Sequence, residues 1–364
     1  MSTIKEARTS LLEVSLDRPF LAGGLYMVSS VPHVLLRLRD GDGTEGVSYL
    51  YTHSHLLIRS LRTLLEDMTA LTVGEDPMDI EAIRAKLRLA TNWGGPGGVV
   101  MAALATVDVA LWDLKGKLLG QPLYRMLGGF RDRVPTYASG ALWRNFSLKE
   151  LQEAASRFVQ QGFRAMKLRL GSEPSAEKEV ERMRVVREAV GPDVDVMVDI
   201  NQTWTPHQAV RIGRMLEEHN LYWLEDPVDH QDVRGSARVA HAITAPVTAG
   251  EYHWGMPPLR VLLENEAVDI LMVDLMRVGG ITDWMKAAGM AEGFRVPVAS
   301  HICPEVLCHT VAAVPNGLTV EYMPWSFRIL EEPPKVEKGM LVLPQHPGTG
   351  VRLDERAVKQ YAVQ

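Results

Sequence analysis

The chain has 364 residues, of which 46% are hydrophobic and 23% charged, and its formal net charge is −6. These proportions are typical of a soluble globular protein, and the length predicts two domains. The negative charge argues against a nucleic-acid-binding surface, which needs a basic stripe.

The first part of the chain, to about residue 130, predicts an α+β domain. Its first twenty residues lack the apolar core of a signal peptide. Two strand-like runs come next, separated by the turn signal DGDG, and amphipathic helical patterns follow them. The strand-like runs cover 31–40 and 44–52, and the helical patterns cover 55–74, 77–90 and 99–118.

The longest apolar stretch lies within the last of these helical patterns, at residues 99–112. It is too short to span a bilayer, and it contains Asp108. We therefore expect a buried helix there and no association with a membrane.

From about residue 135 the pattern changes to short apolar strands that alternate with amphipathic helices, for example over 147–162 and 175–191. Eight strands joined by helical crossovers predict a parallel (β/α) barrel. The strand candidates cover 136–140, 165–170, 195–201, 222–227, 246–251, 269–275, 296–301 and 318–323.

The second strand candidate carries two cations, Lys167 and Arg169, on one face, because side chains alternate along a strand. One interpretation is that this face is exposed to water, as in many half-buried sheets. The other is that both cations line an enclosed site that holds an anion. The neighbouring strands favour the second interpretation.

Polar residues recur at the carboxyl end of strand after strand, where the active sites of such barrels lie. They are Lys167, Arg169, Asp199, Asn201, Glu225, Glu251, Asp274, His301 and Glu321. Single residues here have structural explanations, because Asp226 before Pro227 is typical of a turn and Asp199 or Asn201 could cap the next helix. A repeat over seven strands is harder to explain in that way, because buried unpaired carboxylates are costly.

Three of these acids, Asp199, Glu225 and Glu251, are spaced 26 residues apart, one βα unit each. Converging carboxylates repel each other unless a cation lies between them. An all-oxygen ligand set indicates Mg²⁺ rather than Zn²⁺.

Asp274 and His301 lie on adjacent predicted strands and can form a hydrogen-bonded pair. A carboxylate bonded to one imidazole nitrogen fixes the tautomer and raises the basicity of the other nitrogen.

Taken together and in order, these motifs resemble the enolase superfamily, and within it the mandelate racemase subgroup. The segments that carry the resemblance are 103–129, KLR (167–169), VDIN (198–201), WLEDP (223–227), AGE (249–251), VDLMRVGGIT (273–282), ASH (299–301) and VEYM (320–323). The resemblance implies a (β/α)7β TIM-like barrel over 131–330. It also implies an α+β capping domain over 1–130 and a C-terminal segment, 331–364, that packs back on the cap. Cap loops near 19–30 and 49–55 are implied to set substrate choice.

The resemblance also implies roles for the strand-end residues. Asp199, Glu225 and Glu251 are the expected Mg²⁺ ligands, and His301 is the general base, paired with Asp274. Asn201 matches a position that hydrogen-bonds a substrate hydroxyl. Lys167 and Glu321 match positions beside the substrate carboxylate. The superfamily uses a Lys or His base with Mg²⁺ to stabilise an enediolate.

Arg169 departs from the racemase pattern, which has a second Lys base at this position. A guanidinium is a poor base but is well suited to holding a carboxylate. The first expectation is therefore an acid-sugar dehydratase that converts an aldonate or aldarate to a 2-keto-3-deoxy acid. The alternatives are a racemase or epimerase of a 2-hydroxy acid, a muconate-type cycloisomerase, and a catalytically silent metal-dependent binding protein.

The chain has two cysteines, Cys303 and Cys308, so a disulfide framework is not implied and a reducing cytoplasm fits. The run HICPEVLCH (301–309) does not have the spacing of a usual zinc site. The expected partner is a small-molecule carboxylate, and a homo-oligomer between dimer and octamer is implied by the resemblance.

Overall fold

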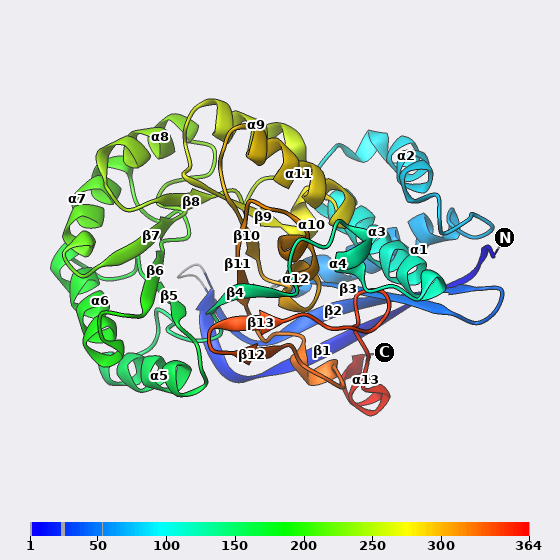
Figure 1. The fold of residues 1–364 in the computed structure, drawn as a ribbon, viewed down its shortest axis with the longest axis horizontal. Coiled ribbons are helices and arrows are strands. Elements are labelled where there is room, and N and C mark those ends of the chain that lie inside the picture. Colours follow the sequence, from blue (N-terminus) through cyan, green and yellow to red (C-terminus); the bar gives the residue numbers. More distant parts are fainter. Residues whose placement is uncertain (1, 23–25, 53, 364) are drawn as a thin grey trace.

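The computed structural model describes residues 2–22, 26–52 and 54–363. Figure 1 shows a ring of strands and helices beside an elongated antiparallel sheet with its own helices. Parts of the two loops expected to set substrate choice, at 23–25 and at 53, lie outside the described residues.

An antiparallel sheet with the strand order β14-β1-β2-β3 forms the first part. Its long strands are β1 (Ile4–Ala22), β2 (Tyr26–Asp40) and β3 (Glu45–Tyr51). Strands β2 and β3 confirm the two predicted runs, whereas β1 was not predicted. The alternation of apolar residues that marks a strand is hard to recognise in β1. Charged residues interrupt the buried ones, such as Leu12 and Val14, and the register of β1 with β2 shifts twice.

Helices cover this sheet and confirm the predicted helical patterns. They are α1 (His55–Ala70), α2 (Ile80–Ala90), the short η1 (Asn92–Gly94), α3 (Gly98–Leu119) and α4 (Leu123–Met126). Helix α3 is buried over most of its length, as expected. In the part of the chain that the structure describes, none of the helices is both long enough and apolar enough to cross a membrane.

Asp108, in the middle of α3, ties the cap to the barrel. Its side chain is fully buried, and it accepts hydrogen bonds from Arg84 Nη1 at 2.7 Å and Thr282 Oγ1 at 2.5 Å. Because Arg84 also pairs with Asp283 at 2.5 Å, one buried ionic cluster joins helices α2 and α3 to the barrel.

Eight parallel strands form a closed barrel, since β11 pairs with β4. This confirms the predicted fold. The strands are β4 (Arg133–Ala138), β5 (Ala165–Arg169), β6 (Asp195–Asp199), β7 (Leu221–Glu225), β8 (Val247–Ala249), β9 (Ile270–Asp274), β10 (Val298–His301) and β11 (Gly317–Tyr322). The helices between them form the outer ring in Figure 1: α5 (Leu148–Gln160), α6 (Ala176–Val190), α7 (Pro206–Glu217), α8 (Val233–Ala242), α9 (Met256–Glu264), α10 (Leu275–Val278), α11 (Ile281–Gly293) and α12 (Pro304–Ala313).

Several of these strands end in a sharp backbone turn. Asn201 (φ 43°), Asp226 (φ 41°) and Ile302 (φ 47°) follow β6, β7 and β10 and adopt the left-handed region that non-glycine residues rarely occupy. Such strain persists where the surrounding structure holds it, and it is frequent at functional sites. Here the turns redirect the chain at the carboxyl end of the barrel, where the predicted polar residues lie.

After the last barrel strand, η2 (Phe327–Ile329) leads into the C-terminal segment, 331–364, which contacts both parts of the molecule. Its hairpin, β12 (Lys335–Glu337) and β13 (Met340–Val342), pairs with barrel strand β4 rather than with the cap, because the start of β4 offers a free edge. Helix α13 (Glu355–Tyr361) and strand β14 (Ala362–Val363) then reach the cap, where β14 pairs with β1. The end of the segment therefore adds a strand to the cap sheet.

Candidate active site

A cavity of about 130 Å³ lies between the carboxyl end of the barrel and the cap. The cap contributes Phe20, Leu21 and Ala22 to its wall. The predicted site residues that line it are Lys167, Arg169, Asp199, Asn201, Glu251, His301 and Glu321. Glu225 lies in contact with Lys167, and Asp274 lies in contact with His301, so the structure brings the nine predicted residues into one connected cluster.

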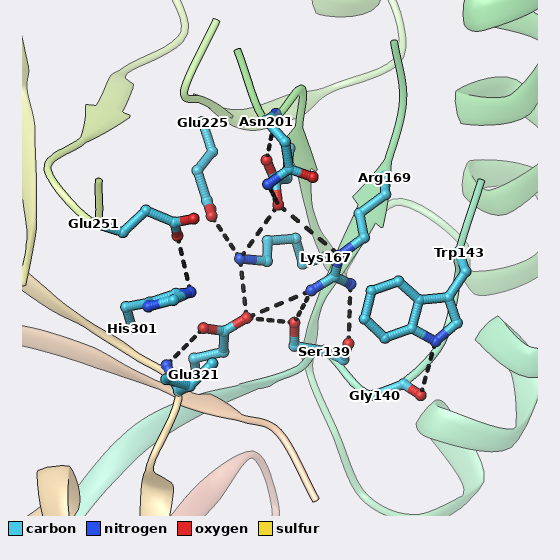
Figure 2. Close-up of polar contacts among 12 residues, drawn as sticks. Ser139, Gly140, Trp143, Lys167, Arg169, Asn201, Glu225, Glu251, His301 and Glu321 are labelled. Carbon is cyan, nitrogen blue, oxygen red and sulfur yellow. Dashed lines mark hydrogen bonds and ion pairs between the residues drawn. The ribbon is translucent and has the colours of Figure 1, made fainter. Parts of the chain in front are cut away.

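Lys167 is at the centre of this cluster (Figure 2). Its Nζ lies 2.5 Å from Glu225 Oε1, 2.9 Å from Glu321 Oε1 and 3.7 Å from Asp199 Oδ2. Burial lowers the pKa of Lys167, but the surrounding carboxylates outweigh burial and raise it well above its ordinary value. Lys167 is therefore a fixed ammonium cation among three carboxylates.

Arg169 is held rigidly beside it. Its guanidinium donates to the Ser139 carbonyl at 2.9 Å and to Ser139 Oγ at 2.8 Å, and it stacks on Trp143 with 3.9 Å between Cζ and the ring centroid. Both cations are 5% exposed or less. The interpretation that they lie on a water-exposed face is therefore wrong, and they face an enclosed site instead.

Three carboxylates, from Asp199, Glu225 and Asp226, place ligand-type oxygens within 4.8 Å of one another. Burial raises the pKa of Glu225 and Asp226 well above the ordinary values, because desolvation disfavours the charged form. Asp226 Oδ2 is buried without a hydrogen-bond partner. A buried, under-satisfied group of hard oxygen donors is what a divalent cation such as Mg²⁺ requires, so the residues fit that ion.

This cluster differs from the predicted ligand set in one member. Glu251 does not belong to it but faces the base, with its Oε2 3.1 Å from His301 Nε2. Asp226 was interpreted from the sequence only as a turn residue, because it precedes a proline. Its left-handed backbone after β7 is consistent with that turn, which also brings its side chain to the acidic cluster.

His301 and Asp274 form the predicted pair, since His301 Nδ1 lies 2.5 Å from Asp274 Oδ2. Burial lowers the pKa of His301, but Glu251 and Asp274 outweigh burial and raise it to about 9. With Nδ1 held by Asp274, Nε2 is the nitrogen that faces the cavity and can exchange a proton.

Glu321 lies across the site from the acidic cluster. Its Oε1 accepts from Lys167 and from Ser139 Oγ at 2.5 Å, and its Oε2 accepts from the Ile302 backbone amide at 2.8 Å. Burial raises the pKa of Glu321, but Lys167 outweighs burial, so the pKa falls to about 2. Glu321 is therefore an ionised, immobile acceptor.

Sequence reasoning missed several residues of the cavity wall, namely Trp143, Arg144, Tyr252, Arg277, Met323 and Trp325. Trp143 and Arg144 come from the loop after β4, which has no hydrophobic periodicity to mark it. Arg277 could have been found from its place three residues after Asp274. It stacks on Tyr252 with 4.8 Å between Cζ and the ring centroid.

A second cavity, of about 280 Å³, lies on another side of the His301–Asp274 pair. Its wall is mainly apolar and comes largely from the cap. The apolar residues that line it are Leu50, Leu57, Leu61, Val99, Ala102, Trp254, Met276 and Ile302. The base is therefore flanked by a polar cavity and by an apolar one.

The run HICPEVLCH shows no metal-binding arrangement among the described residues. Cys303 and Cys308 are both buried free thiols, and His309 is bonded to the Thr349 carbonyl at 2.9 Å. Both cysteines pack in the hydrophobic core, where free cysteine is most often found.

Two family models together match most of the chain. Residues 9–128 match the N-terminal domain of the mandelate racemase/muconate lactonizing enzyme family, and residues 150–357 match the enolase C-terminal domain-like family. Among curated proteins, the chain is 31% identical to L-talarate/galactarate dehydratase of Salmonella typhimurium, over 94% of this chain and 85% of the relative. It is 29% identical to 3,6-anhydro-alpha-L-galactonate cycloisomerase of Streptomyces coelicolor, over 99% of both chains.

A solved structure of the Salmonella dehydratase, with Mg and L-lyxarohydroxamate bound, superposes with a TM-score of 0.94 at 30% identity. The superposition covers 100% of this chain and 93% of the other.

Proposed function

This chain belongs to the mandelate racemase subgroup of the enolase superfamily, and from that membership we propose that it is a Mg²⁺-dependent acid-sugar dehydratase. It removes the proton α to a carboxylate of an aldonate or aldarate and then eliminates water from C2 and C3. The observation that carries this proposal is the site itself. One His–Asp pair lies on one side of the cavity, and on the other lies a Lys–Arg pair whose cations are held by Glu225 and by Ser139.

In the proposed reaction His301 Nε2 takes the C2 proton, and the electron pair of that C–H bond moves into the carboxylate to give an enediolate. The pair then returns to form the C2=C3 double bond and expels hydroxide from C3. Protonated His301 returns the proton to the leaving hydroxide, so water departs. The resulting enol becomes a 2-keto-3-deoxy acid. Arg169 and Lys167 stabilise the negative charge as it develops, because they are already in place.

Mg²⁺ is the cofactor of this superfamily member, and when bound it supplies positive charge beside the developing enediolate. We propose Asp199, Glu225 and Glu251 as its ligands. Asp226 is the nearest competitor for the third position, because it belongs to the carboxylate cluster of the structure. The homo-oligomeric state, between dimer and octamer, stays a prediction.

The proposed function is tested by incubating the enzyme and Mg²⁺ with a library of mono- and diacid sugars and trapping 2-keto acids with semicarbazide. We expect a keto acid from at least one sugar configuration. Epimer formation without a keto acid, or no reaction with any acid sugar, would overturn the dehydratase proposal.

A second candidate, racemisation or epimerisation of a 2-hydroxy acid, is favoured by the apolar cavity beside His301, which suits an apolar substrate tail. It requires a base on each face of the α-carbon. Arg169 is not a base, and Lys167 is surrounded by three carboxylates, so dehydration remains the first proposal.

Arg169 gives a direct test of the choice between these two reactions. Replacing Arg169 with Met removes a preorganised donor, and we expect kcat to fall by about 10²–10³-fold. Arg169→Lys keeps the charge and should retain part of the dehydratase activity. The new amine also lies on the face opposite His301, so exchange of the C2 proton of the C2 epimer should become faster than in the wild type.

Exchange of the C2 proton is measured by NMR in D₂O with each of the two C2 epimers. If the wild type already exchanges the C2 proton of both epimers efficiently, a second base is at work and one-base dehydration is wrong.

A further inference from the structure

Asn201, the residue expected to bind a substrate hydroxyl, has most of its hydrogen-bonding capacity in use within the protein. Its amide nitrogen donates to Asp199 Oδ2 at 3.0 Å and to Tyr252 Oη at 3.2 Å. Its amide oxygen accepts from Arg144 Nη1 at 2.8 Å. A side-chain amide has only two N–H groups, so Asn201 has no donor left for a substrate.

Arg144, in contrast, has a hydrogen-bond donor that the protein does not use. It lines the catalytic cavity and is 5% exposed. Its Nε donates to the Leu170 carbonyl at 2.6 Å and its Nη1 to Asn201, but Nη2 is buried with no hydrogen-bond partner in the structure. The protein thus holds the guanidinium by one edge and leaves the other nitrogen unused.

Arg144 also makes no direct hydrogen bond to a carboxylate among the described residues. Its two hydrogen-bond acceptors are a carbonyl and an amide oxygen, both neutral. Burial lowers the pKa of Arg144 below its ordinary value; the carboxylate of Asp199 opposes this shift, and Arg169 adds to it by a smaller amount. Burying a charge without a partner is costly, and a guanidinium is shaped to bind a carboxylate through paired hydrogen bonds. An anionic group of the substrate is the partner that best removes this cost.

We propose that Arg144 is a specificity-determining residue that binds a second carboxylate of the substrate, and that Asn201 positions it. The substrate class is then the aldarates, acid sugars with a carboxylate at each end, rather than the aldonates, which end in a hydroxymethyl group. This inference rests on the proposed dehydratase function and narrows it.

The test compares an aldarate with the aldonate that differs from it only at the terminal carbon. The pair is galactarate and D-galactonate if the acid-sugar library shows the galacto configuration to be fastest, and D-glucarate and D-gluconate if it is the gluco configuration. If another configuration is fastest, the aldarate and the aldonate of that configuration are compared. We expect wild-type enzyme to have the higher kcat/KM with the aldarate.

In Arg144→Gln the ratio of kcat/KM between aldarate and aldonate should fall by about 100-fold, mainly through a higher KM for the aldarate. A 100-fold change in this ratio corresponds to the free energy that is lost when one partner of a buried, charged hydrogen bond is removed. Arg144→Lys, which keeps the charge but not the planar fork, should restore part of the ratio. Arg211→Gln, at an exposed ion pair on α7, is the matched control and should leave the ratio unchanged.

The outcomes separate this inference from the function on which it rests. If the library yields a keto acid but the ratio is the same in wild type, Arg144→Gln and Arg144→Lys, the substrate does not have its second carboxylate at Arg144. Wild-type preference for the aldonate would overturn the inference in the same way. If none of the acid sugars reacts, it is the dehydratase proposal that fails.

Discussion

His301→Asn should lower turnover by about 10²–10⁴-fold, the contribution of a positioned general base, and should stop exchange of the substrate C2 proton. The physical reason is that the side-chain amide of Asn cannot accept the proton that His301 Nε2 takes. Asp274→Asn should have a smaller but strong effect, because the imidazole then loses the carboxylate 2.5 Å from its Nδ1 that fixes its tautomer. Both are measured by keto-acid formation and by NMR in D₂O.

The matched control is His241→Asn, which makes the same substitution at an exposed histidine on α8 that pairs with Glu266. It should leave both rates unchanged. Wild-type proton exchange in His301→Asn would show that the base lies elsewhere, and Lys167 would become the next candidate.

Removal of Mg²⁺ should lower turnover about as strongly as His301→Asn does. We expect EDTA to abolish turnover and added Mg²⁺ to restore it. Glu225→Gln keeps the shape of the side chain, and an oxygen remains for the Trp223 Nε1 hydrogen bond, so the barrel should stay folded. Because a charged ligand is lost, Mg²⁺ affinity should fall by at least about 10–100-fold, the cost known for disturbing groups that merely orient metal ligands. Full activity of metal-free enzyme would contradict the metal site.

Two further variants decide which carboxylate is the third ligand. Because an ion that binds only the folded state stabilises it, Mg²⁺ titration followed by thermal unfolding reports affinity without turnover. Glu251→Gln should weaken this stabilisation strongly and Asp226→Asn only slightly. The reverse order would assign the third position to Asp226, as the cluster in the structure suggests.

The barrel and its polar strand ends could be predicted because each strand follows a simple rule. Its apolar residues are continuous, and its functional residues come at the end, where all parallel strands point to one face. Lys167, Asp199 and His301 were found in this way. Arg144 could not be, because it comes from an irregular loop and its importance lies in one unpaired nitrogen, a property of the fold alone.

The direction in which a site side chain points could also not be predicted from the sequence. The 26-residue spacing of the acids places Glu251 at the end of its strand but does not show that the side chain faces His301. The strand β1 was missed for a related reason, because a long strand at a sheet partly open to solvent carries as many charged residues as a loop does.

The pairing of β14 with β1 has a consequence for the order in which the protein is made. Leu11 and Val363 are partners in the cap sheet, although nearly the whole chain separates them. A chain emerging from the ribosome therefore presents β1 long before its partner strand exists, whereas neighbouring barrel strands appear one after another. We infer that the edge of β1 at Leu11 and Leu12 stays unpaired until β14 has been made, which is after all eight barrel strands.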